Sequence, residues 1–141
     1  MGMLTSVRAL GVAASVLVCT CAHADGLPAG TWDITWLEPR LTPASKAFKT
    51  QFVRCYAPAE EAKGVNPMMP REQAAKCKTT LSTIGGDIVY DTECGDVDHR
   101  LRLSECGSGY CGTYRYSARK QKAILETIVI VRPTGAKCER S

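Results

Sequence analysis

The stretch CKTTLSTIGGDIVYDTEC, residues 77–94, decides the fold class of this chain. Side chains alternate in character on either side of Gly85-Gly86, as in two β-strands, and paired glycines supply the positive φ that a two-residue hairpin turn needs. If the residues that flank the glycines pair with each other, seven steps outward place Cys77 opposite Cys94. An odd step ends on a non-hydrogen-bonded pair, whose Cα atoms lie about 4.5 Å apart. A disulfide accepts this separation, so the stretch predicts an antiparallel hairpin that Cys77 and Cys94 can close.

Period-two alternation recurs along the rest of the chain. It predicts further strands at residues 31–36, 48–56, 99–104, 112–117 and 123–131. The last of these runs is the richest in isoleucine and valine, which indicates a central strand covered on both sides and ended by Pro133. We therefore expect a mainly β domain: a small antiparallel barrel or a strongly curved sheet of about seven strands.

One stretch has the signature of a helix. Pro58 stands near its start, acidic residues follow in the first turn, and Gly64 ends it, so the sequence predicts one short helix over residues 58–63. An irregular loop is expected from there to Lys76. Residues 57–76 thus form the longest irregular feature of the chain, and such loops are often functional.

The N-terminal residues 1–24 resemble a secretory signal peptide. Arg8 precedes an apolar stretch over residues 9–19, and Ala22-His23-Ala24 has the form that signal peptidases cleave. Cleavage after Ala24 leaves a single β domain, residues 25–141. We expect this domain to be periplasmic or secreted.

Composition and charge exclude some classes of partner. The chain has 141 residues, of which 45% are hydrophobic, and a net charge of +4 that falls to +3 once Arg8 is removed with the signal peptide. No apolar run is long enough to span a membrane. The most basic run, residues 115–122, has the character of a solvated hairpin tip, so we expect no nucleic-acid partner.

An even number of cysteines follows the signal peptide, which indicates disulfides in an exported chain. They are Cys55, Cys77, Cys94, Cys106, Cys111 and Cys138. Cys106 and Cys111 flank a natural four-residue loop and can close it; with Cys77 paired to Cys94, Cys55 and Cys138 then remain for each other. The alternative pairs Cys55 with Cys77 and Cys94 with Cys138, and the sequence leaves both open. Their spacing matches no zinc signature, so we expect no metal site.

Aromatic side chains gather on the predicted strand faces. Trp32 and Trp36 are four residues apart on one strand and point to the same side. They either fill the core or line a cup for a small apolar or amphipathic ligand, together with Phe48, Phe52, Tyr114 and Tyr116. Met68-Met69 in the long loop would cap such a cup.

His99 is the one histidine after the signal peptide, and it invites an acid–base role beside Asp96 and Asp98. The alternative is a polar turn that enters a strand. Nucleophile-elbow, zinc-protease and phosphate-loop motifs do not occur, and an even cysteine count argues against a free catalytic thiol. We therefore expect no catalytic residues and no cofactor.

Several short motifs resemble one family in their order along the chain. They are Pro28-Ala29-Gly30-Thr31-Trp32 at the start, Cys55-Tyr56-Ala57-Pro58, the cysteine pair around the glycine hairpin, and Gly135-Ala136-Lys137-Cys138 at the end. This order resembles the bacterial exported family named domain of unknown function 3617. The resemblance implies a mostly β domain outside the cytoplasm and no known activity. Cys106 and Cys111 are additions to the four cysteines that the family shares, which favours their pairing with each other.

The functional expectation follows from export, disulfides and the lack of catalytic motifs. The leading hypothesis is a non-enzymatic binding domain for a small apolar ligand or an envelope partner. The alternative is an interaction or inhibitor module that presents the Cys106–Cys111 hairpin or the 57–76 loop. A hydrolase that uses His99 is the weakest of the three hypotheses.

Overall fold

The computed structural model describes residues 25–38, 48–120 and 123–138, so the predicted signal peptide lies outside the described residues. The elements are β1 Gly30–Glu38, β2 Phe48–Tyr56, α1 Pro58–Ala62, α2 Arg71–Ala74, β3 Lys78–Ile84, β4 Asp87–Cys94, β5 Val97–Cys106, β6 Gly109–Ala118 and β7 Ala123–Pro133. The mainly β prediction is confirmed. The long loop differs from expectation, because α2 forms directly after Pro70, whose ring fixes φ near the value a helix start needs.

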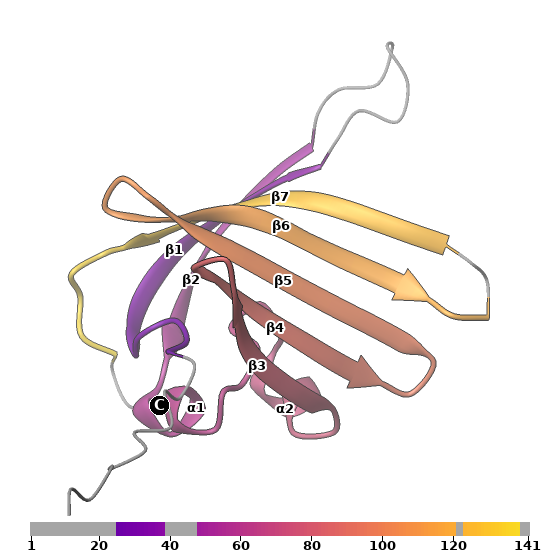
Figure 1. Cartoon of the computed structure of the whole chain (residues 1–141). Helices are drawn as coiled ribbons and strands as arrows, with labels where there is room; N and C mark the ends of the chain where they lie inside the picture. The colour runs from indigo at the N-terminus through magenta and orange to yellow at the C-terminus, as the bar shows by residue number, and fades with distance from the viewer. Residues whose placement is uncertain (1–24, 39–47, 121–122, 139–141) are drawn as a thin grey trace, which may run out of the picture.

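The seven strands form one antiparallel sheet in the order β2-β1-β7-β6-β5-β4-β3. Since β2 and β3 lie at opposite edges, the sheet is curled but not closed into a barrel (Figure 1). In β6, a Cβ added to Gly112 would collide with the backbone carbonyl of Arg102 on β5. Glycine within a strand permits this kind of close backbone approach.

The glycine hairpin has the predicted register. Ile84 pairs with Asp87, and the ladder continues outward to Lys78 opposite Glu93. Gly85 and Gly86 both have positive φ, 59° and 87°, as a type I′ turn requires. Residues with a side chain rarely adopt such values. The Cα atoms of Cys77 and Cys94 lie 4.7 Å apart and the two residues form a disulfide.

The other disulfides are Cys106–Cys111 and Cys55–Cys138. The alternative pairing of Cys55 with Cys77 is therefore not formed. The hairpin at Cys106 is tighter than the predicted four-residue loop, because Gly109 and Tyr110 already belong to β6 and only Gly107-Ser108 forms the turn. Cys106 and Cys111 thus lie diagonally across a two-residue turn.

The core lies on the concave face of the sheet, which α1, α2 and the segment between them cover (Figure 1). Its members alternate along the strands, as Ile34, Leu101, Leu103, Val129 and Val131 do. This core occupies the covered, concave face, and the opposite, convex face carries the alternate residues of each strand.

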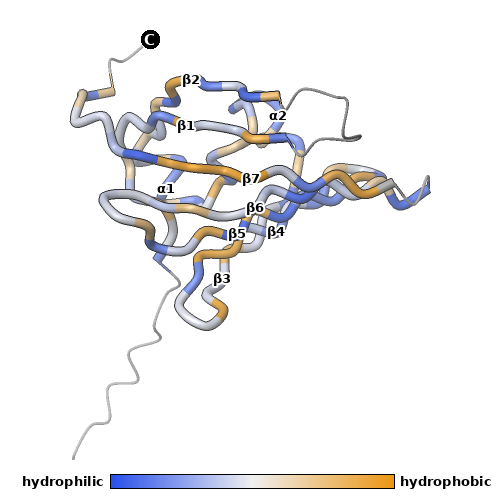
Figure 2. The backbone as a smooth tube through the Cα atoms, turned by 90° about the horizontal axis from the view of Figure 1, so that it is seen from above, coloured by the Kyte–Doolittle hydropathy of each residue, from blue (hydrophilic) through white to orange (hydrophobic). Residues whose placement is uncertain are grey.

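The prediction that residues 123–131 are covered on both sides is wrong. β7 is central, between β1 and β6, and Figure 2 shows its apolar run in the middle of the sheet. However, Ile124 and Ile128 point to the convex face with 58% and 52% of their surfaces exposed. A single sheet with helices on one side buries only alternate residues of a central strand, and here the exposed alternates are apolar too.

Candidate functional site

The two tryptophans of β1 point to the same concave face but lie in different surroundings. Trp32 is 7% exposed, its ring centroid lies 6.0 Å from that of Tyr110, and its Nε1–H donates a hydrogen bond of 2.9 Å to the Pro28 carbonyl. Leu27 is fully buried in the same cluster. The N-terminal residues and β6 therefore fill the end of the concave face around Trp32, which we call the filled end.

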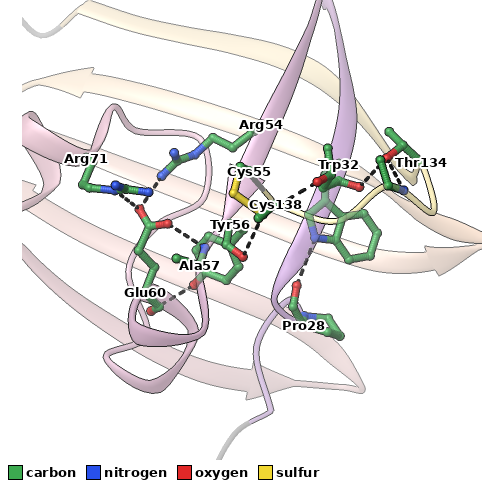
Figure 3. The surroundings of a disulfide bond; sticks show 12 residues. Pro28, Trp32, Arg54, Cys55, Tyr56, Ala57, Glu60, Arg71, Thr134 and Cys138 are labelled. Atoms are coloured by element: carbon green, nitrogen blue, oxygen red, sulfur yellow. Dashed lines mark hydrogen bonds and ion pairs between the residues drawn. A yellow bond between two sulfur atoms is a disulfide. The ribbon is translucent and has the colours of Figure 1, made fainter. Parts of the chain in front are cut away.

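A buried ionic clamp holds the helical segment, residues 57–76, against β2 (Figure 3). The Glu60 carboxylate accepts hydrogen bonds from Arg54 Nη2 at 2.9 Å, from Arg71 Nε at 3.4 Å and from the Ala57 N–H at 2.8 Å. Arg54 Nε also donates to the Pro67 carbonyl at 2.7 Å. Burial alone would raise the pKa of Glu60, but the Ala57 N–H and the two guanidinium groups outweigh it and lower that pKa. Glu60 is therefore ionised at neutral pH, and its charge is matched.

Neutral hydrogen bonds fix the same segment to the end of β2 and to β4. Tyr56 donates its hydroxyl proton to the Val65 carbonyl at 2.7 Å. Asn66, fully buried, donates through Nδ2 to Thr92 Oγ1 at 3.2 Å and accepts the Met68 N–H at 3.0 Å. These bonds hold Met68 against the concave face, in keeping with the predicted role of this methionine as a cap over an apolar cleft.

The opposite end of the concave face is open. A pocket of about 300 Å³ lies there between the helical segment and strands β1, β5, β6 and β7. Four aromatic rings line it, those of Trp36, His99, Tyr114 and Tyr116, and we call it the aromatic pocket. Met68, Met69 and Leu125 supply most of the remaining apolar lining.

The rings of the aromatic pocket brace one another. Trp36 stacks on Tyr114 with centroids 5.4 Å apart, and Phe52 meets the Trp36 ring edge-on at 5.8 Å. His99 and Tyr116 pack edge to face at 5.2 Å. Such contacts are favourable beyond simple burial, so the wall keeps its shape without a ligand.

His99 and Tyr114 share the shortest polar contact in the pocket, 2.5 Å between Nδ1 and the phenol oxygen. Burial lowers the pKa of His99, although Asp98 opposes the shift. Burial and the neighbouring Tyr116 raise the pKa of Tyr114 to about 12. Both side chains are therefore uncharged at neutral pH, and the pair presents a neutral wall.

The acidic neighbours of His99 do not take part. Asp98 faces the convex side and pairs with Arg119 at 3.2 Å, and Asp96 pairs with Lys120 at 3.0 Å. The alternative expectation of a polar turn that enters a strand is confirmed, because Gly95 and Asp96 form the turn before β5. His99 lies inside β5, opposite Tyr116, and is buried. These ion pairs engage Arg119 and Lys120 of the basic run 115–122, of which residues 121–122 lie outside the described chain.

The six aromatic residues predicted to line a cup divide into three groups. Trp36, Tyr114 and Tyr116 line the aromatic pocket, and Phe52 supports Trp36 from behind. Trp32 belongs to the filled core, and Phe48, at the end of β2, is 62% exposed.

His99, Leu125 and Thr127 complete the wall and were not predicted to do so. The sequence signal for them is strand alternation, because each lies two residues from another residue that faces the concave side.

Larger hollows lie elsewhere on the molecule. One of about 550 Å³ separates α1 from α2, and one of about 660 Å³ lies beside the Cys55–Cys138 disulfide. Alanine side chains and the clamp residues Glu60 and Arg71 line the first, and Arg71 also reaches the second. The charges of the clamp are already paired, so the aromatic pocket is the better candidate for a ligand.

The described residues contain no group of three or more histidine, cysteine or acidic side chains placed to hold a metal ion. In the same part of the chain, no helix is both long and apolar enough to cross a membrane. Three disulfides are consistent with an extracellular or periplasmic protein. Comparisons of the chain with protein-family models, with curated proteins and with solved structures find no match.

Proposed function

We propose that residues 25–141 form an exported, non-enzymatic domain that binds one small, mainly apolar ligand in the aromatic pocket. The observation that carries this proposal is the pocket itself, which four braced rings line at the open end of an otherwise filled concave face. Its volume, about 300 Å³, lies at the lower end of the range of small-molecule sites.

Preorganisation supports binding. The helical segment is held by the Glu60 clamp and by Asn66, and the rings pack on one another, so few groups need to be ordered when a ligand enters. A rigid apolar pocket binds with a smaller entropic cost than a mobile one. The exposed mouth of the pocket includes Leu125, which is 46% exposed and available to a ligand.

Export and family membership are part of the proposal. The signal-like residues 1–24 and the pairing of all six later cysteines support cleavage after Ala24 and residence in the periplasm. The motif order supports membership of the family of domain of unknown function 3617.

The surroundings of His99 support a binding role over hydrolysis. Its imidazole is buried and uncharged, its Nδ1 is engaged by Tyr114, and Asp98 points away to Arg119. A general base in a hydrolase needs an orienting acid and a reachable nucleophile. Here the partner of the ring is a phenol whose own pKa is raised.

The test is calorimetric titration of the mature protein, purified from a periplasm, with a panel of small aromatic and branched aliphatic compounds. Native mass spectrometry of the same material shows any ligand carried through purification. We expect binding that Leu125→Ala weakens several-fold and that Ile128→Ala leaves unchanged. These residues lie on the same strand with similar exposure but face opposite sides of the sheet. Equal effects of both variants, or no binding by any compound, would overturn the proposal.

A further inference from the structure

The charge on the described lining of the aromatic pocket is one-sided. Among the described residues that line it, Glu38 is the only one with a charged side chain. Gln73 and Thr127 are neutral, and His99 is kept neutral by burial. The pocket thus offers a ligand one carboxylate, at the end of β1, and no cationic side chain from the described chain.

Three guanidinium groups of the described chain have partners outside the pocket. Arg54 donates to Glu60 and to the Pro67 carbonyl, and Arg71 also contacts Glu60. Arg119, at the end of β6, pairs with Asp98 on the convex side. Because these guanidinium groups have anionic partners, they contribute little positive potential to the pocket.

The apolar lining also favours positive charge. The faces of Trp36, Tyr114 and Tyr116 carry the negative part of the ring quadrupole, which attracts ammonium groups. The sulfur atoms of Met68 and Met69 are polarisable and tolerate a neighbouring cation. The chain as a whole has a positive net charge, so any preference for a cation must come from these local groups.

We infer that the aromatic pocket selects a small organic cation: a quaternary or alkylated ammonium attached to an apolar or aromatic body. The ammonium lies against the rings and is paired with Glu38 at the mouth, while the apolar body contacts the two methionines and Leu125. This inference rests on the proposed function, since it names the ligand class of the same pocket. A purely apolar ligand would make no use of Glu38, which gives the two ideas different consequences.

The test compares three probes of similar size and shape by calorimetry at low salt. They are 4-hydroxyphenyltrimethylammonium, its neutral isostere 4-tert-butylphenol, and the anionic 4-hydroxybenzenesulfonate. We expect the cation to bind about tenfold more tightly than the neutral compound, in keeping with a partly desolvated cation–π contact, and the anion to bind least. Raised salt weakens only the cation.

Two sets of variants locate the effect. Glu38→Gln is expected to weaken the cation about fivefold and to leave 4-tert-butylphenol unchanged, whereas the control Glu105→Gln, beside Tyr110 at the filled end, changes neither. Tyr116→Phe keeps the ring and retains cation binding, and Tyr116→Leu loses several-fold. Tyr116 is exposed enough for both variants to fold.

The outcomes separate this inference from the proposal on which it rests. Equal binding of cation and neutral isostere, or tighter binding of the neutral compound, overturns the cation inference and leaves the apolar pocket standing. Cation binding that Glu38→Gln and Tyr116→Leu do not alter also overturns it, because the cation would then bind elsewhere. Absence of binding by all three probes overturns both.

Discussion

Trp32 and Trp36 lie on one strand, point to one face and differ only in what the rest of the chain brings to them. Trp32 meets Tyr110, the Pro28 carbonyl and buried Leu27, so its surroundings are complete. Trp36 stacks on Tyr114 and then borders a pocket of about 300 Å³. The difference shows that this curled sheet, covered from one side, has a filled core at one end and a pocket at the other.

The position of the helical segment explains this asymmetry. Its clamp, formed by Arg54 and Glu60, lies at the end of β2. The start of β1 is at the same place, because Gly30 pairs with Tyr56. From there the segment passes under the sheet and presents Met68 and Met69 toward the open end. Two methionines cap part of the second end, and the remaining volume is the aromatic pocket.

The largest expected effect compares the two tryptophans directly. Trp32→Ala removes a fully surrounded ring and should lower the free energy of unfolding by about 3–5 kcal/mol. The Trp36 side chain already borders empty space. Trp36→Ala should therefore lower the free energy of unfolding by about 1–2 kcal/mol, mainly through the lost contacts with Tyr114 and Phe52. Urea unfolding of the two variants measures both values. Equal losses would mean that the two ends are packed alike.

The next effect tests how much the ionic clamp stabilises the filled end of the molecule. Arg54→Ala leaves Glu60 buried without its main partner and should cost about 3 kcal/mol. The control is Arg100→Ala, which removes a two-bond contact with Asp91 on the exposed convex face and should cost at most about 1 kcal/mol. The same unfolding assay applies. A loss at Arg54 no greater than that at Arg100 would show that the helical segment is held mainly by Tyr56 and Asn66.

Features set by local geometry were predictable from the sequence. The positive φ of Gly85-Gly86 fixes the hairpin register, and the register fixes which cysteine faces Cys94. Alternation likewise assigns Trp32 and Trp36 to one face of β1, and Tyr114 and Tyr116 to one face of β6. These inferences require only neighbours along the chain or across one turn.

Features set by distant contacts were not predictable. Whether the sheet closes depends on how far the β2 and β3 edges stay apart, which no pair of neighbours along the chain decides. Which tryptophan borders empty space depends on Tyr110, which is on β6, and on Leu27, which precedes β1 and is held by a hydrogen bond to Tyr90 of β4. The acids before His99 invited an acid–base role, yet Asp96 pairs with Lys120 and Asp98 with Arg119, and the histidine itself is buried in β5.

The smallest expected effect separates the two ends by pH. The folded pKa of His99, at the open end, is below its ordinary value of 6.5 because of burial. The unfolded chain therefore binds more protons there, and stability falls as the pH drops from above 6.5 toward the folded pKa. The folded pKa of Glu60, at the filled end, is below 4.5, since the Ala57 N–H and the guanidinium groups outweigh its burial, so its contribution is lost only at pH values below 4.5.

Urea midpoints measured from pH 8 to pH 3 should therefore decline in two windows. His99→Gln should flatten the first window and leave the second. Glu60→Gln should lower the midpoint at pH 7, because Arg54 loses its charged partner, and should flatten only the second window. A wild-type profile that is level between pH 7 and pH 5 would show that His99 is as well solvated in the folded state as in the unfolded one. The open end would then admit water to the imidazole, and the contrast with the filled end would be one of hydration rather than of packing.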